Sequence, residues 1–145
     1  MLGGALGAAI WAAQQPLDKR IARRGYDDVE LLGRLVRPDG DGARPIGWAM
    51  HLANGAAFGL AYAELARRLP EDVSPRVSAQ ALAQAENFGL YPLAAVLDRV
   101  HPARGEIAPA FGARQLAQAT WRHAILGVVL GELAARVARR DRSAK

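Results

Sequence analysis

A repeated pattern of histidine and glycine constrains the fold of this chain more than any other feature. The pattern His-x-x-x-Gly-x-x-x-Gly occurs twice, at His51, Gly55 and Gly59 and again at His123, Gly127 and Gly131. At about 3.6 residues per turn, a spacing of four places the imidazole and both glycines of each copy on one helix face. Glycine costs about 1 kcal/mol relative to alanine in an exposed helix interior. We therefore expect these four glycines to be helix-packing residues, at which two backbones approach closely.

Composition favours one small helical domain over residues 1–145. The chain has 31 alanines, 15 glycines and no cysteine among its 145 residues. The lack of cysteine excludes a disulfide framework, a thiolate nucleophile and cysteine-ligated metal sites. Helical periodicity recurs along the chain and no β-strand alternation is found, so the fold class is all-α.

The pattern of apolar segments, proline and glycine gives the expected helices and their boundaries. A first apolar helix is expected to end where Gln14-Gln15-Pro16 interrupts the apolar run, and a connecting segment with one short helix follows. Proline and glycine then separate three longer helices. The expected helices are 2–14, 46–69, 75–100 and 113–139, with a connecting segment over 15–45 that contains the short helix 27–36.

Glycine pairs favour a membrane-embedded bundle of about four helices, whereas the hydropathy favours it only weakly. Three apolar segments carry Gly-x-x-x-Gly, a spacing typical of packed membrane helices. The segment 46–69 would extend about 36 Å, enough to cross a hydrocarbon core of about 30 Å. Mean hydropathy is only −0.02, however. We expect an integral protein of the bacterial cytoplasmic membrane; basic residues are balanced between the two sides, so its orientation stays open.

Polar residues inside the apolar helices are the candidate ligand-binding or proton-relay residues. These are His51, Asn54, Glu86, Arg122 and His123. If the helices alternate in direction, Asn54, Glu86 and His123 fall at similar depths. We expect Glu86 to pair with Arg122 or His123, because a lone buried charge is costly. Two interpretations stay open: a clamp that fixes helix register, or a proton relay, polar ligand site or transport path.

Catalytic and metal-binding signatures are not found in the sequence. No nucleophile elbow, P-loop, dinucleotide-binding loop or di-iron Glu-x-x-His pattern occurs. Haem ligation by His51 and His123 is disfavoured, because they lie at different distances from their helix starts. We expect no catalytic residue, no metal and no cofactor, and the protein is not expected to be an enzyme.

The two histidine–glycine copies also allow a duplicated helical hairpin. They lie 72 residues apart, and short runs at Leu17-Asp18 and Leu97-Asp98 precede them. Duplication would give a four-helix bundle with a pseudo-two-fold axis. Coincidence in a chain rich in alanine and glycine is the alternative.

Five short runs carry a resemblance to a known group of proteins. The runs are WAAQQPLDKR, YDDVELLG, HLANGAAFG, ATWRH and GVVLGEL. Together they resemble a group of small helical integral membrane proteins of bacteria that has no assigned activity. The resemblance implies placement in a membrane and says nothing about site residues or substrates.

These observations predict a small membrane protein with a structural, accessory or small-solute transport role. Its expected partners are the lipid bilayer and further copies of itself, which would meet through the glycine faces. The last ten residues carry five basic side chains against one acid. No aromatic residue lies among them, which argues against nucleic acid as a partner. The alternative is a soluble four-helix binding module with a basic C-terminal tail.

Overall fold

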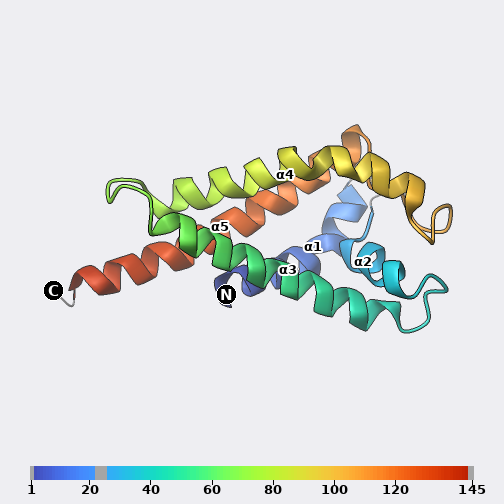
Figure 1. Ribbon diagram of the computed structural model, residues 1–145, viewed down its shortest axis with the longest axis horizontal. Helices are drawn as coiled ribbons and strands as arrows, with labels where there is room; N and C mark the ends of the chain where they lie inside the picture. The colour runs from blue at the N-terminus through green and yellow to red at the C-terminus, as the bar shows by residue number, and fades with distance from the viewer. Residues whose placement is uncertain (1, 22–25, 144–145) are drawn as a thin grey trace.

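The computed structural model describes residues 2–21 and 26–143. Its elements are α1 (Leu2–Ile21), α2 (Asp28–Val36), α3 (Ala43–Ala66), α4 (Pro75–Val100) and α5 (Ala113–Ser143) (Figure 1). Among the described residues there are five helices and no strand, so the fold is all-α. None of these helices has the length and hydropathy that crossing a membrane requires. The membrane-embedded arrangement expected from the sequence is therefore not supported by the structure.

The expected end of the first helix is wrong. The first helix continues through Pro16 to Ile21, seven residues beyond the expected end at residue 14. Proline removes one backbone hydrogen bond from a helix and usually kinks or ends it. Here the turn after Pro16 is held by Asp18, whose carboxylate accepts two hydrogen bonds from Arg122 of α5. Tertiary contacts thus outweigh the local effect of the proline.

The remaining helices begin and end close to signals in the sequence. The Asp27 side chain caps α2, accepting hydrogen bonds from the backbone N–H groups of Val29 and Glu30 at 3.0 and 3.1 Å. Such a cap satisfies two of the donors that a helix N-terminus leaves free. Pro75 opens α4, where a missing N–H costs nothing. The helix α5 runs four residues past its expected end at residue 139.

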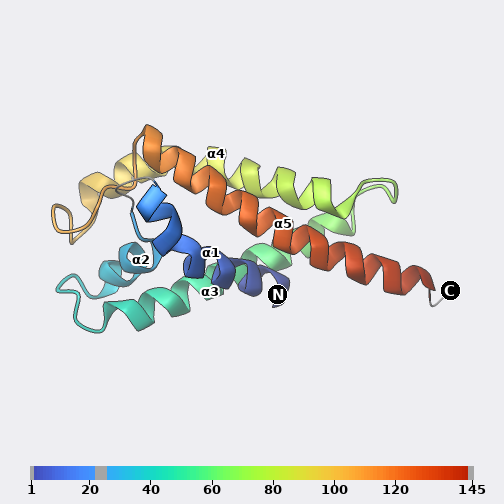
Figure 2. The same ribbon diagram turned by 180° about the vertical axis from the view of Figure 1, so that it is seen from behind.

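The helices form two packed groups joined through α1. α1 lies against α3 and α5, α2 lies against α3, and α4 lies along α5. α3 and α4 scarcely touch and diverge from the loop that joins them, with α1 and α2 lying between their far ends (Figure 1). Seen from behind, α5 runs along α4, and α1 lies between α5 and α3 (Figure 2). The divergence of α3 and α4 is what creates the candidate site.

Glycines allow α1 and α3 to touch through their backbones. A Cβ atom on Gly4 would meet the carbonyl oxygen of Gly55 and would lie 2.7 Å from the backbone nitrogen of Gly59. Gly47 and Gly33 form a similar contact between α3 and α2, since a Cβ on Gly47 would lie 3.0 Å from the nitrogen of Gly33. Backbone cannot move aside as a side chain can, so these positions require glycine.

The second pair of glycines lies between α5 and α4. A Cβ on Gly127 would lie 2.9 Å from the Cα of Gln80, and one on Gly131 would lie 2.8 Å from the Cα of Arg76. Thus α3 packs on α1 through its glycines, and α5 packs on α4 through its glycines. In a duplicated hairpin, α1 and α4 would be the helices that precede α3 and α5. Helices of the same chain thus cover both glycine faces.

Candidate functional site

A cleft opens between the diverging halves of α3 and α4. Its volume is about 510 Å³, within the range of about 300–1,000 Å³ typical of small-molecule sites. Apolar side chains of α4 form one wall, α3 forms the other, and α1, α2 and α5 close the floor. The apolar lining includes Leu31, Leu32, Phe58, Leu90, Leu93, Val96, Leu97, Val100 and Leu126.

Four of the five polar residues proposed from the sequence line this cleft. His51 and Asn54 come from α3, Glu86 from α4 and His123 from α5. Asn54 is exposed at the opening, whereas His51 is buried. The fifth residue, Arg122, does not line the cleft and lies fully buried behind it. The structure thus divides the five proposed residues between a cleft, which four of them line, and a buried ionic network, which contains Arg122.

Both cleft histidines have one ring nitrogen committed to a backbone carbonyl. His51 Nε2 lies 3.0 Å from the carbonyl oxygen of Ala8, and His123 Nδ1 lies 2.7 Å from that of Ala119. A carbonyl oxygen only accepts, so these nitrogens carry the hydrogens. When His123 is neutral, its Nε2 is therefore the unprotonated nitrogen, and it points toward Glu86.

Glu86 and His123 face each other across the cleft floor. Their atoms Oε2 and Nε2 lie 3.6 Å apart, slightly beyond a direct hydrogen bond. Burial raises the pKa of the Glu86 carboxyl above its ordinary value and lowers that of the His123 imidazole. Both shifts have the same cause, because burial disfavours the charged form of each group. The pair therefore offers a ligand a carboxyl group beside the unprotonated Nε2 of the neutral imidazole.

Trp11 connects the cleft with the buried network. Its ring lies edge-on to both cleft histidines, with centroids 5.4 Å from His51 and 4.6 Å from His123. The indole Nε1–H donates to Asp28 Oδ2 at 2.8 Å. This hydrogen bond fixes the indole, and the indole in turn supports the two imidazoles.

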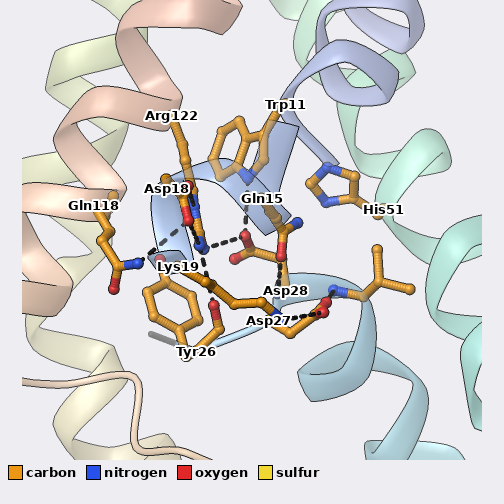
Figure 3. A network of polar contacts seen from close by, with 12 residues as sticks. Trp11, Gln15, Asp18, Lys19, Tyr26, Asp27, Asp28, His51, Gln118 and Arg122 are labelled. Carbon is orange, nitrogen blue, oxygen red and sulfur yellow. Dashed lines mark hydrogen bonds and ion pairs between the residues drawn. The ribbon is translucent and has the colours of Figure 1, made fainter. Parts of the chain in front are cut away.

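The buried network is centred on Arg122 (Figure 3). Its guanidinium binds Asp18 through two hydrogen bonds of 2.7 and 2.9 Å and Asp28 through one of 2.7 Å. It also donates to the carbonyl oxygen of Tyr26 at 3.0 Å and lies 4.6 Å from the centre of that ring. Of the two partners expected for Glu86, Arg122 is wrong, because two closer carboxylates take up its guanidinium. The other, His123, is the residue that faces Glu86.

Charge in this network does not balance. Burial alone would lower the pKa of Arg122, but the hydrogen bonds that its guanidinium donates to Asp18 and the negative charge of Asp28 raise it above its ordinary value. One guanidinium thus faces two carboxylates. The remaining acceptor capacity of Asp18 is met by the side-chain amides of Gln14 and Gln118, at 2.9 and 3.3 Å. The network joins α1, α2 and α5 and supports the cleft from behind.

Three residues of the site were not found from the sequence. Asp18 follows the expected end of the first helix, Asp28 lies in the first turn of the short helix, and Trp11 lies in an apolar run, so no local pattern marks them as site residues. One signal was available: Arg122 lies in an otherwise uncharged helical stretch and so needed a buried acidic partner.

The residues described by the structure contain no group of three or more potential ligands placed to hold a metal ion. Comparisons with protein families, curated proteins and solved structures found no match to this chain. The functional conclusion therefore depends on the geometry of the cleft.

Proposed function

We propose that the protein binds a small molecule with an apolar body and one polar end in the cleft between α3 and α4. The observation that carries this proposal is the cleft itself: apolar walls enclose about 510 Å³, and Glu86 and His123 meet at its floor. Ligand sites in proteins typically combine an apolar lining with a few convergent polar groups. The role that follows is binding or carrying a small solute.

The polar end of the ligand would lie at the Glu86–His123 pair and its apolar body between α3 and α4. Leu90, Leu93 and Val96 of α4 are more than half exposed, although they line the cleft. A bound apolar chain would remove this surface from water, at about 25 cal/mol per Å². Behind the floor, the Arg122 network acts as the clamp that fixes helix register, since the guanidinium is held by both Asp18 and Asp28.

Decanol is a suitable first probe, because it has an apolar chain and one uncharged polar end. We expect saturable binding of decanol by isothermal titration calorimetry. Asn54→Phe, which fills the opening of the cleft, is expected to weaken binding at least about tenfold, since a blocked pocket loses most of the apolar burial. Ala57→Phe adds a ring at an exposed position of α3 outside the cleft and should bind as wild type. Equal binding by both variants would contradict the proposal.

A second candidate is association with the lipid bilayer of the bacterial cytoplasmic membrane, as an accessory or small-solute transport protein. It is favoured by the distribution of charge: no charged residue lies between Arg44 and Glu64 of α3, a length of about 30 Å. Large apolar side chains are also exposed along α1, at Leu2, Leu6, Ile10, Leu17 and Ile21.

Alkaline carbonate washing of bacterial membranes after expression separates this candidate from its alternative. If the protein stays in the pellet and dissolves in detergent, bilayer association is supported. If it appears in the supernatant, the bilayer candidate is rejected in favour of the soluble binding module.

A further inference from the structure

The charged residues that line the cleft have one sign. Asp28 and Glu86 contribute carboxyl groups, and among the described residues no lysine or arginine lines the cleft. The other titratable side chains of the lining are the imidazoles of His51 and His123 and two tyrosine hydroxyls. A ligand with a negative polar end would meet no cation that is permanently charged.

Arg122 is the nearest candidate for such a cation, and its geometry excludes it. It is fully buried, and its guanidinium is committed to Asp18, Asp28 and the carbonyl oxygen of Tyr26. These two carboxylates exceed its single positive charge. The network behind the floor therefore adds negative potential to the cleft, and charges as buried as these are weakly screened.

Aromatic rings complete a surface suited to an organic cation. Trp11, Tyr26, Phe58 and Tyr91 all line the cleft. Aromatic faces attract ammonium groups and also pack against apolar chains. The cleft thus offers a hydrophobic body, a negative floor and aromatic neighbours.

We infer that the ligand is a hydrophobic organic cation, an alkyl or aryl amine whose ammonium group lies beside the Glu86 carboxylate. This inference rests on the proposed function, because it specifies the charge of the ligand's polar end. The ammonium would give Glu86 the opposite charge that no side chain of the lining supplies. His123, uncharged as the Nδ1–H form, would accept a hydrogen bond from the same ammonium at Nε2.

Three probes of equal chain length test this inference on the full-length chain: decylamine, which is protonated at pH 7, decanol and decanoate. We expect decylammonium to bind at least about tenfold more tightly than decanol, since a charge-assisted hydrogen bond contributes more than a neutral one. Decanoate should bind most weakly. Glu86→Gln is expected to reduce decylammonium binding about tenfold and to weaken decanol binding much less, because the amide can still hydrogen-bond a hydroxyl group; circular dichroism checks that the variant is folded.

Glu71→Gln is the matched control, because it removes the same charge from the exposed loop before α4; decylammonium binding should not change. If decanol binds as tightly as decylammonium, or if Glu86→Gln weakens both equally, the cation inference is overturned while the proposed binding site stands. Tightest binding of decanoate would also overturn it. If none of the probes binds, the proposed function itself fails.

Discussion

Replacing Arg122 with leucine is expected to lower the free energy of unfolding by about 3–5 kcal/mol, the usual cost of breaking a buried ion pair from one side. The substitution leaves Asp18 and Asp28 without their shared cation, and both carboxylates lie against α5 with little access to water. It also removes the hydrogen bond to the Tyr26 carbonyl, which helps to hold the start of α2. Urea unfolding monitored by circular dichroism measures the change.

Two variants show whether the loss comes from the unpaired carboxylates. In Arg122→Leu combined with Asp18→Asn, one uncompensated charge is gone, so the double variant should lose clearly less stability than the two single variants added together. Arg114→Leu removes an exposed arginine from the same helix and should change stability by no more than about 0.5 kcal/mol. Near-normal stability of Arg122→Leu would contradict the clamp role.

Gly4→Ala is expected to destabilise the protein by about 1–3 kcal/mol or more, as overpacking of a tight core does. The new methyl group would meet the Gly55 carbonyl oxygen and lie 2.8 Å from the Cα of Gly59. Neither atom can move without shifting α3 away from α1. Because His51 and Trp11 lie on these same helices, the substitution should also weaken decanol binding in the cleft.

Gly89→Ala is the matched control for helix propensity. Gly89 lies within α4, and a Cβ built there meets nothing within 4 Å. Alanine is favoured over glycine inside a helix by about 0.5–1 kcal/mol, so this variant should be slightly more stable than wild type. If both alanine substitutions stabilise the protein, then the close backbone contact between α1 and α3 is not present.

The fold class could be predicted from the sequence because it depends on local pattern. Helical periodicity and the proline and glycine positions act within a few residues of each helix end, as Pro75 at the start of α4 illustrates. The end of α1 could not be predicted in the same way. Pro16 gives a local signal to stop, and the contact that overrides it comes from Arg122, 104 residues away from Asp18.

The heights of the candidate site residues along their helices could be predicted from the sequence, but the partners of the charged residues could not. Helix rise places Asn54, Glu86 and His123 at similar heights, and all three line one cleft. Which acid pairs with Arg122 depends on how far α2 turns back toward α5, and no local pattern encodes that. The divergence of α3 and α4, which makes the cleft, is likewise a property of tertiary packing.

The imidazole signals of the three histidines test the cleft most directly, in a nitrogen–proton correlation spectrum recorded during titration with decanol. His51 and His123 line the cleft. His101 is buried outside the lining, where Nε2 bonds to the Leu31 carbonyl and Nδ1 accepts from the Ala103 N–H. We predict that the His51 and His123 signals shift to saturation while those of His101 stay in place. Unchanged signals of His51 and His123 at saturating decanol would contradict a ligand site between α3 and α4.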